Sequence, residues 1–82
     1  EIMDVENLAY KLIEKLISID ENIIKDRYKV DIAEDTLTVM DDIARKRGCI
    51  LRGNEIDYNK VANLILDDFR KSRMGRITLE TV

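Results

Sequence analysis

One apolar stripe near the start of the chain constrains the fold more than any other feature. Between Asp4 and Ile19, apolar side chains recur every three or four residues, at Val5, Leu8, Ala9, Leu12, Ile13, Leu16 and Ile17. That spacing places them on one face of an α-helix. Asp4 stands just before the stripe, where a carboxylate can accept hydrogen bonds from the first helical N–H groups. We therefore predict a helix whose apolar face is buried against other elements.

Two further helices are predicted before the middle of the chain. Asp20 interrupts the first pattern, and a shorter helix follows from Glu21 to Tyr28, with apolar contacts from Ile23, Ile24 and Tyr28. Asp31 and Glu34 have the spacing of a capping box and are expected to open the third helix. Its inward residues would be Leu37, Met40, Ile43 and Ala44. Gly48 is expected to end it, because glycine readily adopts the left-handed conformation needed there.

A connector from Cys49 to Ile56 separates the third helix from a fourth. Asp57 is expected to cap the fourth helix, which would run to about Met74 and end at Gly75. Its inner face would be Val61, Ala62, Leu64, Ile65 and Phe69. The tail Arg76–Glu80 alternates apolar and polar residues, as a short strand does. The predicted fold class is therefore all-α: a small bundle of three to four helices with a short extended C-terminal tail.

The length of 82 residues suits a single helical domain over residues 1–82. Because the chain opens at Glu1 rather than at an initiating Met, we expect it to be a segment of a longer polypeptide. No apolar run approaches the roughly 20 residues needed to span a bilayer, so no membrane partner is expected. The single cysteine, Cys49, is expected to be a small buried side chain, and a chain without a disulfide fits the cytoplasm.

Catalytic and metal-binding chemistry is not expected in this chain. It has no histidine, one cysteine and no Gly-rich phosphate loop, so it lacks the commonest general base, the ligands of a zinc site and a nucleotide cradle. Paired acids occur at 41–42 and 67–68, but adjacent residues on a helix do not face each other and do not converge on one ion. Tyr10, Tyr28 and Tyr58 are interpreted as residues at the rim of the core rather than as platforms for stacked bases.

Charge is divided unevenly along the chain. Residues 1–42 contain 5 basic and 12 acidic residues, a net charge of -7, whereas residues 43–82 contain 9 and 5, a net charge of +4. Several cations have an acid three or four residues earlier, in the pairs Asp41–Arg45, Asp42–Lys46, Asp67–Arg70 and Asp67–Lys71. Ion pairs at this helical spacing are favourable. These cations therefore have a structural explanation.

Four arginines have no acidic neighbour at helical spacing, namely Arg47, Arg52, Arg73 and Arg76. Two of them, Arg47 and Arg73, also stand near helix C-terminal ends, where a cation complements the helix dipole. The planar guanidinium group suits phosphate particularly well. The residues alone thus favour RNA or another polyanion as the partner, with an acidic protein surface as the alternative.

The chain also contains a series of short blocks in a specific order: Ile43–Cys49 (IARKRGC), Gly53, Ile56–Lys60 (IDYNK), Phe69–Arg70 and Met74–Glu80 (MGRITLE). With weaker similarity around residues 29–31 and in the first helix, these blocks resemble the C-terminal domain of ribosome biogenesis GTPase A, a family of circularly permuted GTPases. That domain is similar to ANTAR-type helical RNA-binding bundles. The resemblance covers essentially the whole chain.

The resemblance implies a helical domain attached to a GTPase domain that acts in late assembly of the large ribosomal subunit. The family's GTP-binding motifs lie upstream of this segment, so GTP, Mg²⁺ and hydrolysis would belong to the rest of the protein and no cofactor is expected here. The chain departs from the family at Ala33, often Pro, which should loosen the start of the third helix. It departs again at Arg52, which replaces a connector glycine and adds a cation. The family's basic residues correspond to Lys46, Arg47, Arg70 and Arg76.

We therefore expect an RNA-binding module without its own enzymatic activity, which docks a GTPase onto precursor large-subunit ribosomal RNA and ribosome assembly intermediates. No DNA partner is expected. Phosphate contacts would come mainly from Arg47, Arg52, Arg73 and Arg76, supported by Arg45, Lys46, Arg70 and Lys71. RNA would be recognised by shape and backbone, because no RNP-type aromatic pattern is present. The alternative is a protein-interaction module that binds a ribosomal protein or the GTPase domain of the same chain.

Overall fold

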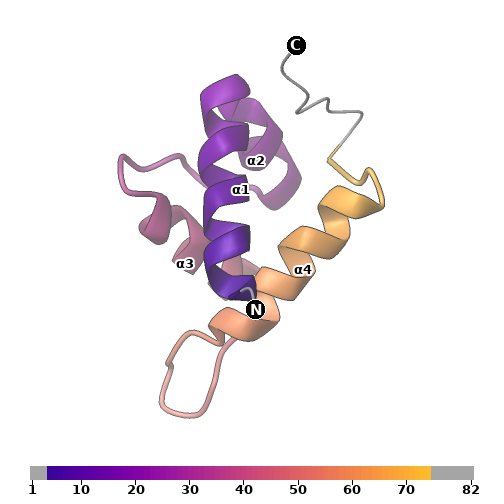
Figure 1. Ribbon diagram of the computed structural model, residues 1–82. Helices are drawn as coiled ribbons and strands as arrows, with labels where there is room; N and C mark the ends of the chain where they lie inside the picture. Colours follow the sequence, from indigo (N-terminus) through magenta and orange to yellow (C-terminus); the bar gives the residue numbers. More distant parts are fainter. Residues whose placement is uncertain (1–3, 75–82) are drawn as a thin grey trace.

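Four α-helices make up the part of the protein that the computed structural model describes, residues 4–74 (Figure 1). They are α1, Val5–Ile19; α2, Glu21–Tyr28; α3, Thr36–Lys46; and α4, Tyr58–Arg70. The all-α prediction is confirmed. The β-type pairing in this stretch amounts to one isolated antiparallel bridge between Ile50 and Ile56, in the connector before α4. The predicted extended tail lies outside the described residues.

The central helix is α1, because its long apolar stripe meets three partners. It packs against α2, α3 and α4, and α3 also contacts α4. In Figure 1, α1 runs through the middle of the view with α3 on one side and α4 on the other. Ala9, Ile13 and Leu16 are fully buried along the stripe. None of the helices found in residues 4–74 is long and apolar enough to cross a membrane.

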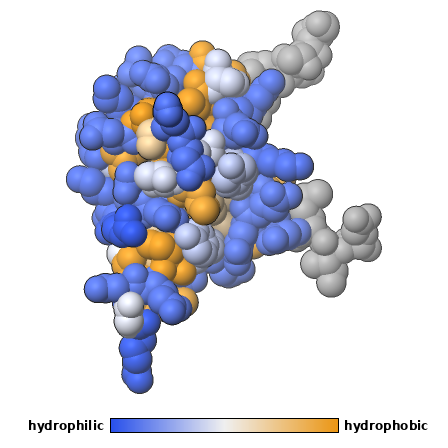
Figure 2. Space-filling view, turned by 90° about the vertical axis from the view of Figure 1, so that its left-hand side faces the viewer, coloured by the Kyte–Doolittle hydropathy of each residue, from blue (hydrophilic) through white to orange (hydrophobic). Residues whose placement is uncertain are grey.

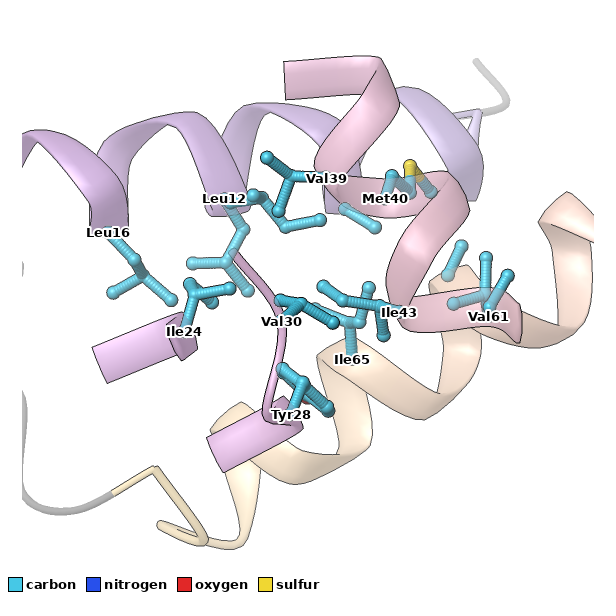
Figure 3. Close-up of a cluster of buried hydrophobic side chains, with 14 of the residues drawn as sticks. Leu12, Leu16, Ile24, Tyr28, Val30, Val39, Met40, Ile43, Val61 and Ile65 are labelled. Atoms are coloured by element: carbon cyan, nitrogen blue, oxygen red, sulfur yellow. The ribbon is translucent and has the colours of Figure 1, made fainter. Parts of the chain in front are cut away.

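The core gathers side chains from all four helices. Figure 3 labels ten of the residues that meet there: Leu12, Leu16, Ile24, Tyr28, Val30, Val39, Met40, Ile43, Val61 and Ile65. Cys49 joins this cluster with no exposed surface, which confirms that it is a buried apolar side chain. Burial raises the pKa of the Cys49 thiol above its ordinary value. Its packing, rather than any reactivity, explains its place in the fold.

An aspartate precedes each helix and accepts a hydrogen bond from one of its first backbone N–H groups; the four are Asp4, Asp20, Asp35 and Asp57. The prediction that Asp31 and Glu34 open the third helix is wrong. Asp35 caps α3 instead, accepting from the N–H of Leu37 at 3.2 Å. The segment before it stays non-helical because Ile32 and Ala33 pack against the core while Val30 is buried in it. Ala33 therefore lies before the helix, not in it.

The later start of α3 changes which of its residues face inward. Leu37 lies in the first turn and is 42% exposed, so its predicted burial is wrong. Val39 is fully buried instead, together with Met40, Ile43 and Ala44 as predicted. On α4, the predicted inner residues Val61, Ala62 and Ile65 are buried and Leu64 and Phe69 are half-buried.

The end of α3 is closed by the predicted glycine. Gly48 has a φ of +73°, in the left-handed region. The N–H of Cys49 donates to the carbonyl of Ala44 at 2.8 Å, and the N–H of Gly48 donates to Arg45 at 3.4 Å. This pair of hydrogen bonds is a Schellman motif, which satisfies carbonyl groups that the helix leaves unpaired. It also fixes Arg47, the residue immediately before Gly48, at the end of the helix.

The fourth helix is shorter than predicted, ending at Arg70 rather than near Met74. Beyond it the chain turns through Ser72, whose φ is +57°, and the N–H of Arg73 donates to the carbonyl of Asp68 at 2.9 Å. Met74 then returns to the core with only 9% of its surface exposed. The turn is therefore stabilised by burial of Met74. The predicted stop at Gly75 lies outside the described residues.

A buried carboxylate links α4 to α2. The side chain of Asp68 is 4% exposed and accepts hydrogen bonds from the Tyr28 hydroxyl at 2.8 Å, from Arg27 at 3.3 and 3.4 Å, and from Arg73 at 3.2 Å. Burial acts to raise the pKa of Asp68, but the hydrogen bonds from Tyr28, Arg27 and Arg73 outweigh it and hold this pKa below its ordinary value. The charged form is thus the one that the folded protein favours.

We predict that Asp68→Asn lowers the free energy of unfolding by about 1–3 kcal/mol near neutral pH, because two guanidinium groups lose their charged acceptor. The pKa of Asp68 is lower in the folded than in the unfolded protein. Its stabilisation is therefore present above the unfolded pKa, about 3.9, and decreases as the pH falls below that value. Urea unfolding at neutral pH and at about pH 3 measures both effects.

Asp67→Asn is the matched control, because Asp67 is the adjacent residue and its side chain is 40% exposed. An exposed ion pair contributes about 0–1 kcal/mol, so this variant should lose less stability than Asp68→Asn. Equal losses in the two variants near neutral pH would show that the buried carboxylate has no special role in the fold.

Candidate nucleic-acid interface

Basic residues gather at the C-terminal ends of three helices. Lys25 and Arg27 lie in the last turn of α2, Arg45 and Lys46 in that of α3, and Arg70 in that of α4. Carbonyl groups at a helix C-terminus carry partial negative charge, so these cations stabilise the helix ends as well as making the surface positive. The cations of α2 were missed in the sequence because they belong to the acidic half of the chain.

A shallow hollow of about 590 Å³ lies beside α4, and we call it the basic hollow. Its lining consists of Arg27, Arg47, Lys60, Asn63, Leu64, Asp67, Asp68, Arg70 and Arg73. Of the predicted site residues it brings together Arg47, Arg70 and Arg73. It adds Lys60, which sequence reasoning missed. Lys60 lies in the first turn of α4, away from the basic clusters that the sequence makes conspicuous.

The other predicted site residues lie elsewhere. Arg45 and Lys46 line a separate depression, with Lys25, Lys29 and three acidic residues among its other lining side chains. Arg52 is exposed in the connector, and Lys71 is exposed just after α4. Arg76 lies outside the described residues. The eight predicted cations therefore do not form one continuous site.

Several of the expected ion-pair partners of these cations are wrong. Arg73, expected to lack an acidic partner, contacts Asp68 at 3.2 Å and Asp67 at 3.6 Å. Helical spacing missed these contacts because α4 ends at Arg70 and the turn beyond it brings Arg73 back over the helix. Arg45 pairs with Asp42 at 3.4 Å, not with Asp41.

Asp41 instead accepts a hydrogen bond from the hydroxyl of Tyr58 at 2.7 Å, and this bond is the main cause of the raised pKa of Tyr58. The predicted pairs of Asp42 with Lys46 and of Asp67 with Arg70 are also not formed in the described part of the chain. The predicted pair of Asp67 and Lys71 is confirmed at 3.2 Å.

Three exposed cations of the basic hollow have no carboxylate within 4 Å among residues 4–74: Arg47, Lys60 and Arg70. Arg52, which is exposed in the connector, likewise has no carboxylate within 4 Å among these residues. The prediction that Arg47 and Arg52 lack an acidic partner thus holds for the described residues. The hollow therefore combines neutralised cations, Arg27 and Arg73, with cations whose charge is not compensated by a direct ion pair.

Arg47 is held by α2 although it follows α3. Its guanidinium group donates to the carbonyl of Arg27 at 3.1 Å and lies 5.0 Å from the centroid of the Tyr28 ring. A guanidinium at this distance from an aromatic ring is attracted by the ring's negative face. Two contacts thus order a side chain that is otherwise long and flexible.

Tyr28 is a core residue and not, as predicted, one at the rim, because only 1% of its surface is exposed. Burial, followed by the hydrogen bond to Asp68, raises the pKa of Tyr28 well above its ordinary value, so the hydroxyl remains a donor at neutral pH.

The position of Asp68 in the sequence indicates that this carboxylate has a buried polar partner. Asp68 lies three residues after Ile65 and seven after Val61, on the buried face of α4. A carboxylate in an apolar stripe indicates a buried polar partner.

The basic side chains of the hollow that lack a carboxylate partner among residues 4–74 are positively charged. They are hydrogen-bond donors, which suit phosphate or carboxylate oxygens. In the described part of the chain, no three His, Cys, Asp or Glu side chains are grouped so that they could hold a metal ion.

Comparison with known proteins reveals clear relatives, although no family model matches the chain. The chain is 39% identical over 59 residues to ribosome biogenesis GTPase A of Bacillus cereus and 41% identical over 58 residues to that of Bacillus pumilus. It is 31% identical over 80 residues to that of Priestia megaterium.

These matches cover 71%, 70% and 96% of the present chain, respectively. They cover only 20%, 21% and 28% of the three relatives, so the chain spans between a fifth and somewhat over a quarter of their length. The resemblance seen in the sequence blocks is thereby confirmed. Over most of its own length, the chain is therefore homologous to ribosome biogenesis GTPase A.

Proposed function

We propose that this chain is the C-terminal RNA-binding module of a ribosome biogenesis GTPase, which docks the enzyme on precursor large-subunit ribosomal RNA in the cytoplasm. The observation that carries the proposal is the group of three exposed cations in the basic hollow, Arg47, Lys60 and Arg70, with no carboxylate within 4 Å in residues 4–74. Homology to ribosome biogenesis GTPase A supplies the ribosomal context. The charges supply the means of binding.

The arrangement of these cations suits a polymer better than a single anion. Lys60 and Arg70 belong to the first and last turns of α4. Ten residues of α-helix span roughly 15 Å, so the two charges lie well apart along the helix axis. Arg47 contributes from the end of α3. A nucleic-acid backbone presents phosphates in series, and cations spread along α4 can each meet a different one.

Recognition by backbone and shape follows from the residues around the hollow. None of its described lining residues is aromatic, so it offers no aromatic ring on which bases could stack. The space-filling view onto the side that carries α3 shows hydrophilic residues over most of that face, with apolar patches between them (Figure 2). That side of the molecule is therefore mainly hydrophilic, as is the lining of the basic hollow.

Nucleotide chemistry is assigned to another part of the protein in this proposal. The chain has no phosphate-binding loop of the G-x-x-x-x-G-K-[ST] type. It corresponds to only 20–28% of relatives that are named as GTPases. We therefore place GTP, Mg²⁺ and hydrolysis in the remainder of the parent protein, with this module as its attachment to RNA.

We predict that the double variant Arg47→Glu, Arg70→Glu binds large-subunit ribosomal RNA transcribed in vitro about 100-fold or more weakly than the unchanged chain, because two charge-assisted contacts are lost. If three phosphates are contacted, the log–log dependence of affinity on salt should have a slope of about -2 to -3. In the double variant the slope should approach -1. Filter binding at several salt concentrations measures both quantities.

The double variant Lys11→Glu, Lys15→Glu is the matched control. It changes the net charge by the same amount, on exposed residues of α1 that do not line the basic hollow. It should weaken binding far less than the variant in the hollow. Equal effects of the two double variants, or a salt slope near zero, would contradict phosphate binding in the hollow.

A second candidate function is docking on protein, and an apolar groove between α1 and α4 favours it. Val5, Leu8, Leu12, Leu66 and Phe69 contribute to the groove, and Leu8 is 41% exposed. Since most of the relatives' length lies outside this chain, the occupant in this alternative is the GTPase domain of the same protein or a ribosomal protein.

This alternative predicts that ribosomal particles retain the chain after ribonuclease treatment and in high salt, and that Leu8→Ser abolishes retention because it removes an apolar contact. Leu51→Ser is the matched control, since Leu51 is 49% exposed in the connector and does not line the groove. Sedimentation with assembling subunits gives the readout. Release of the chain by ribonuclease would favour RNA binding instead.

A further inference from the structure

Arg47 differs from the other uncompensated cations of the basic hollow in being ordered by neighbours. Its guanidinium donates to the carbonyl of Arg27 and lies 5.0 Å from the centroid of the Tyr28 ring. Arg70 makes no side-chain hydrogen bond, ion pair or ring contact of this kind within residues 4–74. Both Arg47 contacts come from α2, so α2 determines where a cation at the end of α3 is placed.

The Tyr28 residue is itself anchored to another helix. Its hydroxyl donates to Asp68 of α4 at 2.8 Å, and only 1% of the residue is exposed. Tyr28 therefore joins three helices: it belongs to α2, it is anchored to α4, and it contacts the arginine that follows α3. A ring held by packing and by a hydrogen bond has little freedom to move away from Arg47.

The neighbouring cations divide into two roles. Arg27 also approaches the Tyr28 ring, at 6.0 Å, but it binds Asp68 at 3.3 Å, and Arg73 binds the same carboxylate at 3.2 Å. Their charges are compensated within the fold. Arg47 also contacts the Tyr28 ring but does not bind Asp68. Its charge is therefore available to a ligand while its side chain is held in place.

We propose that Tyr28 is a positioning residue that holds the guanidinium of Arg47 ready for phosphate, and this inference rests on the proposed function. A free arginine side chain loses considerable conformational entropy when it is fixed on a ligand. Ordering the side chain before binding removes part of that loss and increases affinity. The guanidinium has five N–H donors, so the bond to Arg27 leaves others for an RNA phosphate.

The test uses Tyr28→Leu, Tyr28→Phe and Arg47→Ala in the complete chain, with in vitro transcribed large-subunit ribosomal RNA as the probe. Tyr28→Leu removes the ring and should weaken binding about two- to fivefold, the range expected for one cation–π contact. Tyr28→Phe keeps the ring and loses only the hydroxyl. It should lower thermal stability while retaining most of the affinity for RNA.

The decisive comparison repeats Tyr28→Leu in the Arg47→Ala background. If Tyr28 acts through Arg47, its loss should have no further effect there, and a purely structural role would weaken both backgrounds equally. An equal effect in the two backgrounds, or tighter binding by Tyr28→Leu, would overturn the inference. If Arg47→Ala alone leaves binding unchanged, the proposed phosphate site has failed, which is a different result.

A measurement on the unchanged chain avoids dependence on variants that fail to fold. NMR order parameters of the arginine Nε–H groups should be higher for Arg47 than for Arg70, because Arg47 has the ring and carbonyl contacts. Equal order parameters would overturn the inference, since Arg47 would then not be held in place before RNA binds.

Discussion

The buried carboxylate of Asp68 is the interaction on which the arrangement of this domain depends. A charge in the core is costly unless its hydrogen-bonding capacity is satisfied. Tyr28, Arg27 and Arg73 satisfy it together, so α2, α4 and the turn beyond α4 must keep one relative placement. Apolar packing brings the helices together. This network specifies how their C-terminal ends meet.

The same carboxylate determines which cations of the hollow are available. Arg27 and Arg73 are neutralised by Asp68, with Asp67 as a second partner for Arg73. Arg47 and Arg70 line the same hollow without a carboxylate partner among the described residues. A count of basic residues therefore overstates the positive charge that a ligand meets. Some cations of the basic hollow therefore stabilise the fold and others are left available for binding. The ion pairs with Asp67 and Asp68 determine which cation has which role.

Local sequence patterns predicted the helices well because helical periodicity and aspartate caps act over a few residues. The Asp4 and Asp57 caps, the Gly48 stop and the burial of Cys49 could all be read in this way. The start of α3 was misplaced because two aspartates had suitable positions, and packing of the segment before Asp35 decided between them.

The cations that lack a carboxylate partner could be predicted only in part from the sequence. The pairing of Arg73 depends on a turn after α4, and the pairing of Arg27 with Asp68 joins residues 41 positions apart, beyond the reach of helical spacing.

The Schellman motif at the end of α3 has a practical consequence. It places the sole cysteine of the chain, fully buried, two residues after Arg47. A thiol reagent can reach Cys49 only when this helix end separates from the core. The rate at which Cys49 is modified therefore reports how often the C-terminal end of α3, which carries Arg47, separates from the core. A bound ligand that keeps this helix end packed slows the modification. The native sequence thus contains its own chemical probe of local opening beside the basic hollow.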